Sequence, residues 1–317
     1  MTPLVSICIL TYNHAPYIAQ TLDSMLSQKT NFAFEILIHD DASTDGTDSI
    51  IKEYAAKYPN IIKPLFEEEN QFSKSEIKNI SGIYNFPRAQ GKYIAMCEGD
   101  DYWTDDNKLR TQVDYMEANP YCTLCFHSAV RINKGVFGSR MMRPYIGSRT
   151  VTPEEIITKK SGYPTASLLM RADLMKMLPD FYMKAPIGDI PMQLTMAAGG
   201  YGYYIDKPMC AYRYFTPGSW SRSMYTGDGY KERQDTYLKQ MLEMYDSFDE
   251  FSNHRFTAAV EQAKARITFG NAVNTGKFGE IFTEKNREYL KELPLTDRIL
   301  LNIKYIKNKR LTIKSQH

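Results

Sequence analysis

The stretch "KYIAMCEGDDYWTDD", residues 92–106, joins an apolar segment directly to a dense group of carboxylates. Its first part, KYIAMC, is β-prone and predicts a buried strand. Like charges this close together repel one another unless a cation lies between them or water solvates them. The stretch therefore indicates a strand whose end faces solvent or binds a positive ligand. The carboxylates are Glu98, Asp100, Asp101, Asp105 and Asp106.

Outward from this stretch, strand patterns alternate with helix patterns. Pro64 lies in the third expected strand, at 60–68, and predicts a position at a sheet edge, because proline cannot donate a hydrogen bond to a β-ladder. Such alternation predicts an α/β fold with a parallel, doubly wound sheet. Further strands are expected at 4–11, 34–40, 60–68 and 121–132, and helices at 15–28, 43–58 and 107–120.

Polar residues follow three of the expected strands. Thr11 to Asn13 end the first, His39 to Asp41 end the second, and Glu98 to Asp101 end the fourth. The carboxyl ends of parallel strands share one rim of a sheet, where ligands bind. The chain lacks the glycine-rich loops GxGxxG and GxxxxGK[ST] that hold phosphates. A phosphate at this acidic rim therefore needs a bridging cation, and Mg²⁺ or Mn²⁺ suits carboxylate and phosphate oxygens.

Simpler roles for these carboxylates remain open at this stage. Asp100 and Asp101 could form an Asx turn, and Glu98 could be solvated at a strand end. Asp105 and Asp106 precede a helix, which favours a capping role over a ligand role.

Composition limits the classes of protein. The 317 residues are 43% hydrophobic and 24% charged, which is typical of a globular protein, and a net charge of +2 gives no reason to expect nucleic acid as a partner. The five cysteines are odd in number and scattered, which favours reduced thiols and a cytoplasmic location. The lone Cys122–Cys125 pair lacks the second pair that zinc requires. We expect no signal peptide and no membrane-spanning segment.

Three segments together resemble the family 2 glycosyltransferases: "VSICILTYNHAPYIAQTLDSMLSQ" (5–28), "HDDASTDGTDSII" (39–51) and "GKYIAMCEGDDYWTDDNKL" (91–109). The resemblance is strongest over residues 4–120 and extends to about residue 222. It implies a GT-A fold, a Rossmann-like and mostly parallel sheet flanked by helices. It also implies an inverting transfer of a sugar from a nucleotide diphosphate, here a UDP-sugar, with Mn²⁺ or Mg²⁺ as cofactor.

The same resemblance assigns the donor side residue by residue. Thr11 and Tyr12 match the strand end that frames the nucleotide base. Asp41 matches the residue that accepts a hydrogen bond from the uracil ring. Asp100 is expected toward the ribose and donor sugar, and Asp101 on the metal.

Two further segments extend the donor side. "NISGIYNFPRAQ" (79–90) aligns loosely with a donor-contacting stretch and supplies Asn85 and Arg88. "AYRYFTPGSWSRS" (211–223) matches a segment that usually contains Tyr-Arg-x-His, which places Arg213 near the diphosphate. Phe215 stands where that histidine usually helps to hold the metal, so Asp101 is expected to be the main protein ligand.

The resemblance places the catalytic base at Asp189, within Gly-Asp-Ile-Pro, where it takes the proton of the acceptor hydroxyl. The alternative is a helix N-cap, and both roles are compatible. Thr165 and Ser167 are candidates for the acceptor side. Trp220 is a candidate stacking platform for an acceptor sugar, and core packing is equally open.

The chain changes character after the transferase-like region. We expect a GT-A domain at 1–225 and a helical extension at 226–317. In the tail, Ile299, Leu300, Ile303 and Ile306 share one helical face, and basic residues follow. This pattern fits peripheral contact with an anionic membrane, or a docked terminal helix with a solvated end.

The resemblance implies surface polysaccharide synthesis on a saccharide or lipid-linked acceptor, in the cytoplasm or at the inner face of the cell membrane. Two other classes stay open. Phe215 leaves room for a catalytically inactive sugar-nucleotide-binding protein. A nucleotidyltransferase is disfavoured, because "LTYNHAPY" (10–17) is neither glycine-rich nor basic.

Overall fold

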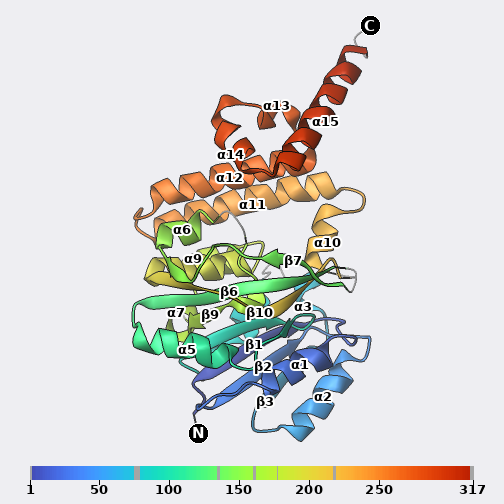
Figure 1. Cartoon of the computed structure of the whole chain (residues 1–317). Helices are drawn as coiled ribbons and strands as arrows, with labels where there is room; N and C mark the ends of the chain where they lie inside the picture. Colours follow the sequence, from blue (N-terminus) through green and yellow to red (C-terminus); the bar gives the residue numbers. More distant parts are fainter. Residues whose placement is uncertain are drawn as a thin grey trace.

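A computed structural model describes residues 2–74, 79–133, 136–159, 162–176, 178–216 and 219–314. Its centre is a single mixed sheet with the strand order β3-β2-β1-β4-β9-β6-β10-β5, with β7 paired to β6 and β8 to β10 (Figure 1). The strands are β1 Val5–Thr11, β2 Phe34–Asp40, β3 Ile62–Phe66, β4 Tyr93–Glu98, β5 Tyr102–Trp103, β6 Cys122–Asn133, β7 Val136–Met142, β8 Arg149–Val151, β9 Leu169–Arg171 and β10 Tyr201–Tyr214.

The first four long strands form the expected parallel unit. β1 pairs in parallel with both β2 and β4, and β2 pairs in parallel with β3. β3 lies at the edge, as Pro64 predicts. β1 and β2 are buried over nearly all of their length, because helices cover both faces of the sheet. This part of the fold is confirmed.

One short strand reverses the pattern in the middle of the sheet. β9 is antiparallel to β4 and also antiparallel to β6, so β6 runs in the same direction as β4. β10 pairs in parallel with β6 over most of its length. The carboxyl ends of β1, β2, β4, β6 and β10 therefore point the same way, although β9 separates two of them.

Two core clusters lie on the two faces of the sheet. Alternate residues of one strand point to opposite faces, so Ile7 and Ile9 join one cluster while Cys8 joins the other. The helices α1 Ile18–Leu26, α2 Thr47–Lys57 and α5 Lys108–Ala118 pack on the first face. The second face is covered by α4 Ile80–Tyr84, η1 Phe86–Arg88, α6 Pro153–Ile157, α7 Ala172–Lys176, α8 Asp180–Lys184 and α9 Asp189–Gly199.

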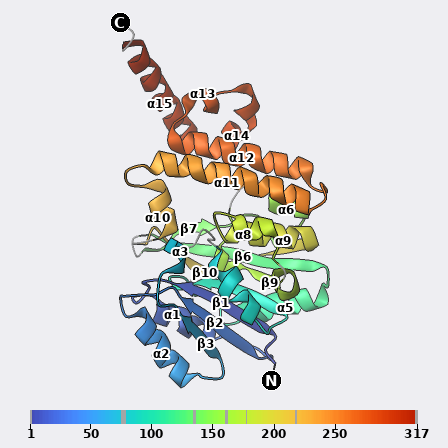
Figure 2. The ribbon, with the colours of Figure 1, turned by 180° about the vertical axis from the view of Figure 1, so that it is seen from behind.

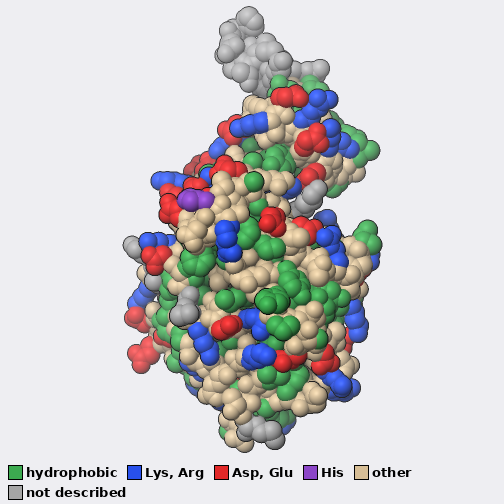
Figure 3. Space-filling model, turned by 90° about the vertical axis from the view of Figure 1, so that its left-hand side faces the viewer, with side chains coloured by type: hydrophobic (Ala, Val, Ile, Leu, Met, Phe, Trp, Pro, Cys, Tyr) green, Lys and Arg blue, Asp and Glu red, His purple; other side chains and the backbone are tan. Residues whose placement is uncertain are grey.

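The expected helical region follows the sheet. Its elements are α10 Trp220–Tyr225, α11 Tyr230–Phe251, α12 Thr257–Thr275, α13 Phe278–Ile281, η3 Glu284–Asn286, α14 Arg287–Glu292 and α15 Leu295–Lys314. The remaining short elements are α3 Gln71–Lys74 and η2 Thr165–Ser167. Figures 1 and 2 show α11 and α12 lying side by side across one end of the molecule, with α15 extending away. Figure 3 shows that the C-terminal helical region is narrower than the part of the molecule that contains the sheet.

The first two long helices of this region share the core of the sheet. Met244 and Phe248 of α11 and Val260 of α12 belong to the same buried cluster as Cys8 of β1. A separate small cluster joins the end of α12 to α13 and α15. The expected boundary after residue 225 falls between α10 and α11, and hydrophobic packing is continuous across it.

The last two observations on the fold concern the cysteines and the apolar character of the helices. All five cysteines are buried free thiols. Within the ranges given above, no helix combines the length and the apolar character needed to cross a bilayer.

The shared core predicts that Phe248 contributes strongly to the stability of the whole protein, because its side chain is fully buried against Phe181 and Phe256. Phe248→Ala should lower the free energy of unfolding by about 3–5 kcal/mol, because it removes a buried ring and leaves a cavity. Phe251→Ala, on the same helix but 47% exposed, is the matched control and should cost about 1 kcal/mol. Urea unfolding followed by circular dichroism measures both. A separate early transition of the helices, with the sheet unaffected, would contradict the shared core.

Candidate active site

The polar strand ends meet at one rim of the sheet, as the sequence predicts. In the parallel registers, Leu10 of β1 lies beside Glu98 of β4, and Thr11 lies beside Asp40 of β2. The backbone N–H of Asp41 donates to the carbonyl oxygen of Thr11 at 3.0 Å. The rim is therefore a continuous row of backbone that presents three groups of polar side chains.

The loops after β1 and β2 are hydrogen-bonded to each other. The backbone N–H of Asn13 donates to Ser43 Oγ at 2.9 Å, and that of His14 donates to Thr47 Oγ1 at 2.9 Å. Asn13 Oδ1 accepts from the backbone N–H of Thr44 at 2.8 Å. Asn13 has φ 55°, a left-handed conformation that asparagine tolerates better than most residues. These bonds fix the first two groups of the rim relative to each other.

Gly99 lets the end of β4 approach β1 closely. Its N–H donates to Leu10 O at 2.8 Å, and a Cβ at this position would lie 2.6 Å from Thr11 Oγ1. Thr21 Oγ1, on α1, lies 3.0 Å from the carbonyl oxygen of Gly99 and 2.6 Å from that of Asp101. The backbone that carries Asp100 and Asp101 is thus held on both sides.

Arg213, near the carboxyl end of β10, reaches the same turn. Its backbone N–H donates to Asp101 Oδ1 at 2.8 Å, and its guanidinium donates to the carbonyl oxygen of Asp100 and to Gln20 Oε1. Thr216 Oγ1 donates to Asp100 Oδ2 at 2.9 Å. The structure therefore brings Asp100, Asp101 and Arg213 together, and Asp101 is only 1% exposed.

The carboxylates here carry more negative charge than their surroundings neutralise. Burial raises the pKa of Glu98 to about 8, and the charges of Asp100 and Asp189 add to this effect. Burial also raises the pKa of Asp101 well above its usual range, with Asp100 and Glu98 as further causes, although Arg213 opposes the shift. Burial lowers the pKa of His14, so its ring is neutral at pH 7 and adds no compensating charge. The cluster is thus suited to a cation.

The donor set fits a hard divalent cation. Asp100 and Asp101 offer oxygen ligands, and Mg²⁺ or Mn²⁺ commonly takes one or two carboxylates and completes its shell with phosphate oxygens and water. Phe215, at φ 63°, supplies no ligand where the resemblance expects histidine. No group of three or more His, Cys, Asp or Glu side chains in the described ranges is arranged to hold a metal by itself.

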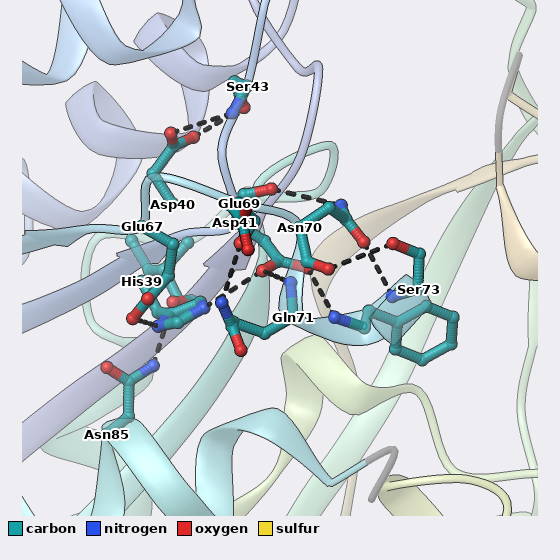
Figure 4. Close-up of polar contacts among 12 residues, drawn as sticks. His39, Asp40, Asp41, Ser43, Glu67, Glu69, Asn70, Gln71, Ser73 and Asn85 are labelled. Carbon is teal, nitrogen blue, oxygen red and sulfur yellow. Dashed lines mark hydrogen bonds and ion pairs between the residues drawn. The ribbon is translucent and has the colours of Figure 1, made fainter. Parts of the chain in front are cut away.

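Asp41 faces a different set of donors (Figure 4). Its Oδ1 accepts from the backbone N–H of Gln71 at 2.6 Å, and its Oδ2 from that of Phe72 at 3.0 Å. Burial pushes the pKa of Asp41 upward, but the His39 ring, with Nε2 3.6 Å from Oδ1, and these two N–H groups outweigh it and hold the pKa below its usual range. Asp41 is therefore an ionised acceptor beside α3, at the end of β2.

Asp189 is the first residue of α9. Its Oδ1 accepts from the backbone N–H of Ile190 at 2.8 Å, and its backbone oxygen accepts from Gln193 Nε2 at 3.0 Å. Its charge contributes to the raised pKa of Glu98, so it lies on the same side as the acidic cluster. Burial lowers the pKa of Lys159 to about 8 against the attraction of Asp189, and Lys159 Nζ donates to Gln193 Oε1.

The acceptor-side candidates differ in their burial and in their contacts. Trp220, at the start of α10, is half-buried and packs edge-on against Tyr237 of α11, with ring centroids 5.4 Å apart. Burial, with the Asp189 charge as the next cause, raises the pKa of Tyr237 well above its usual range. Thr165 is half-buried. Ser167 is fully buried and its hydroxyl donates to Pro164 O at 2.6 Å, so it cannot face an acceptor in this conformation.

The remaining donor-side candidates also differ in whether their side chains lie exposed at the rim. Tyr12 is 45% exposed beside the rim, as a base-framing side chain requires. Asn85 is fully buried, and its Nδ2 donates to Ile9 O at 3.0 Å beneath β1. Arg88 donates to Lys63 O at 2.7 Å and lies near Glu35, toward the amino end of β2. The structure therefore does not bring Arg88 to the rim, because its guanidinium bonds to the backbone of β3 instead.

Sequence reasoning missed three residues that lie around this site. His14 follows the TYN sequence directly, so its place beside Thr11 could have been anticipated from the strand end. Lys159 and Tyr237 carry no local signal, because only the packing of α6 and α11 against α9 brings them near Asp189.

The fold and the site together define an α/β protein. The rim at the carboxyl ends of its parallel strands, where such folds bind ligands, is acidic and suits a cation. The family model Glycosyl transferase family 2 matches residues 6–178, and the chain belongs to this family. The uncharacterized protein Rv1520 of Mycobacterium tuberculosis is 33% identical over 222 residues, 70% of this chain and 62% of that relative. This chain thus aligns with less than two thirds of that relative's length. The putative teichuronic acid biosynthesis glycosyltransferase TuaG of Bacillus subtilis is 38% identical over 114 residues, 36% of this chain and 42% of TuaG.

Solved structures agree with the fold. S. aureus TarS 1–349 in complex with UDP-GlcNAc superposes with a TM-score of 0.60 at 17% identity, covering 95% of this chain and 79% of that one. The mannosyltransferase PcManGT from Pyrobaculum calidifontis, in complex with GDP-Man and Mn²⁺, gives 0.53 at 16% identity, covering 96% and 85%. The expected GT-A fold, with its mostly parallel sheet and helical C-terminal region, is confirmed.

The raised pKa of Glu98 predicts how stability depends on pH in the metal-free protein. Between its unfolded pKa near 4.5 and its folded pKa of about 8, the native state keeps a proton that the unfolded chain releases. The Glu98 contribution to stability is therefore lost as pH rises through this window. The Glu98→Gln variant has no titrating group at this position. The melting temperature of the variant minus that of the wild type should therefore increase between about pH 5 and about pH 8 in EDTA. A difference between the two proteins that does not change with pH would contradict the raised pKa of Glu98.

Proposed function

We propose that this chain is an inverting glycosyltransferase that uses a nucleotide-diphosphate sugar, with UDP as the nucleotide, and a divalent cation. The observation that carries the proposal is the Asp100–Asp101 turn at the acidic rim, where Asp101 is buried, Arg213 bonds to both residues, and the charge of Asp189 raises the pKa of Glu98. Family membership supports the reaction class. The complexes of TarS with UDP-GlcNAc and of PcManGT with GDP-Man and Mn²⁺ are consistent with the donor and the metal.

The donor is proposed to lie along the rim from β2 to β10. Thr11 and Tyr12 frame the base, and the ionised carboxylate of Asp41 accepts the uracil N–H. Asp100 faces the ribose and the sugar. The Arg213 guanidinium, half-exposed above the turn, is positioned to approach the diphosphate from the side of β10.

Asp101 would hold Mn²⁺ or Mg²⁺ together with the diphosphate, and the cation would stabilise the charge that grows on the leaving nucleotide. The residues of this chain then have two tasks around it. The N–H of Arg213 orients Asp101 through Oδ1. Thr216 orients Asp100 through Oδ2, which keeps the two carboxylates from turning away from each other.

Asp189 is proposed as the base. In an inverting transfer, the acceptor hydroxyl attacks the anomeric carbon from the face opposite the leaving diphosphate, so the base must lie on the acceptor side. Asp189 lies near enough to Glu98 and Tyr237 for its charge to raise the pKa of both, and the half-buried ring of Trp220 packs against that of Tyr237. These rings are suited to contact an acceptor sugar, and Thr165 is the remaining polar candidate there.

Asn85 and Arg88 are proposed to act indirectly, since their side chains bond to the backbone of β1 and β3. The acceptor class proposed is a saccharide or a lipid-linked saccharide in surface polysaccharide synthesis, at the cytoplasmic face of the cell membrane. The likeness to TuaG, named for teichuronic acid biosynthesis, supports this class.

One observation favours a second candidate, a sugar-nucleotide-binding protein without transferase activity. Phe215 offers no metal ligand in the place where the resemblance expects one, and it packs against Tyr214 with ring centroids 4.2 Å apart. Release of free nucleotide from a panel of nucleotide sugars, with and without candidate acceptors, separates the two candidates. Acceptor-dependent release supports a transferase, and tight binding without release supports the binder.

The metal assignment predicts the behaviour of Asp101→Asn, which keeps the size of the side chain and can still accept from the Arg213 N–H. Nucleotide release should fall by at least about a hundredfold, because the diphosphate would lose its cation beside Glu98 and Asp100. The wild type in EDTA should be equally impaired and should recover with Mn²⁺. Full activity of the variant, or of the wild type in EDTA, would overturn this assignment.

The base assignment predicts a selective loss in Asp189→Asn. The amide oxygen of asparagine can still accept from the Ile190 N–H, so the variant should melt like the wild type and bind UDP-sugar normally. Transfer should fall by about 10²–10⁴-fold. Asp180→Asn, on α8 with a side chain 96% exposed, is the matched control and should keep the wild-type rate. Near-normal transfer by Asp189→Asn would place the base elsewhere.

A further inference from the structure

The two faces of α15 have different surroundings. On one face Leu301 is 8% exposed, and the ring of Tyr305 lies 4.8 Å from that of Phe282 and 6.1 Å from that of Phe278. The other face is apolar yet uncovered by the described parts of the chain. Its large side chains and their exposed fractions are Leu295 64%, Ile299 50%, Leu300 54%, Ile303 45% and Ile306 51%.

The exposed side chains form a stripe, because Ile299, Ile303 and Ile306 are four and three residues apart. Lys304 and Lys307 are exposed on the same helix and lie along one side of this stripe. Residues 298–317 contain six Lys or Arg and no Asp or Glu. Among the side chains that the structure describes, α15 therefore exposes an apolar stripe with Lys304 and Lys307 beside it.

Charge decides between the partners that such a surface could bind. A second copy of the chain on this face would bring two sets of lysines together, which like-charge repulsion opposes. An anionic lipid surface attracts the lysines and accepts the isoleucines into its interfacial region. Figures 1 and 2 show that α15 begins beside α12 and then extends away from the sheet and from α11.

We propose that α15 binds the surface of an anionic lipid bilayer through the stripe of Ile299, Ile303 and Ile306, with Lys304 and Lys307 at the headgroups. Binding of this kind lays a helix along a membrane without crossing it. It would hold the protein where a lipid-linked acceptor lies, a consequence that rests on the proposed function, whereas the binding itself does not.

Co-sedimentation of the full chain with vesicles tests the proposal. The protein should sediment with vesicles of phosphatidylcholine mixed equally with phosphatidylglycerol, and should stay in solution with phosphatidylcholine alone. Ile303→Glu with Ile306→Glu should weaken binding to the anionic vesicles by at least about tenfold, because two apolar contacts are lost. Lys304→Gln with Lys307→Gln should weaken binding and reduce its dependence on salt.

Ile146→Glu is the matched control, because Ile146 is 88% exposed on the loop between β7 and β8, far along the chain from α15. It should bind vesicles like the wild type, and all variants should keep the wild-type melting temperature. Equal binding by the wild type and the Ile303/Ile306 variant would overturn the proposal, as would no binding of the wild type to anionic vesicles. A dimer in sedimentation equilibrium that this variant dissociates would identify a second copy as the partner instead. Nucleotide release with a soluble acceptor reports on the proposed function separately.

Discussion

The mutual repulsion of carboxylates held away from water is the constraint on which the rim depends. Glu98, Asp100 and Asp101 follow one buried strand, and Arg213 is the cation that reaches their turn. Its guanidinium bonds to the backbone and to Gln20, so it neutralises the cluster incompletely, as the raised pKa values of Glu98 and Asp101 indicate. The fold stabilises this unfavourable arrangement through the Gly99 N–H, which donates to Leu10 O, and through the Thr21 hydroxyl, which lies against the carbonyl oxygens of Gly99 and Asp101. A cation with its diphosphate would relieve the repulsion, which explains why a folded chain can keep such a cluster.

Much of this arrangement could be predicted from the sequence. Continuous apolar runs identified β1, β2 and β4, and the polar residues just beyond them had to share a rim once the strands were parallel. Pro64 indicated the edge position of β3. The convergence of Thr11, Asp41 and Asp101 thus follows from local pattern and sheet geometry. The assignment of Asp189 depended instead on resemblance, because a carboxylate at a helix start has an equally good capping role.

The rest depends on contacts between distant parts of the chain. β9 and β5 are too short to predict from periodicity, and the pairing of β10 with β6 and β5 is what carries Arg213 to the rim. The positions of Ser167 and Arg88 could not be predicted from their sequence, since only tertiary packing shows that the Ser167 hydroxyl is buried and that the Arg88 guanidinium bonds to the backbone of β3. Likewise, a helical pattern at 230–251 does not reveal that Tyr237 lies beside Asp189 or that Phe248 shares the core of the sheet.

A cation that joins this acidic rim to a nucleotide diphosphate is central to the proposed function. Crystals grown with UDP and Mn²⁺, measured at the manganese absorption edge, test this directly because the anomalous signal locates the metal without assumptions about its ligands. We expect one strong peak between the Asp101 carboxylate and the diphosphate oxygens, with the uracil ring near Asp41. UDP bound at the rim without an anomalous peak beside Asp101, or a diphosphate bound away from the Asp100–Asp101 turn, would contradict this expectation.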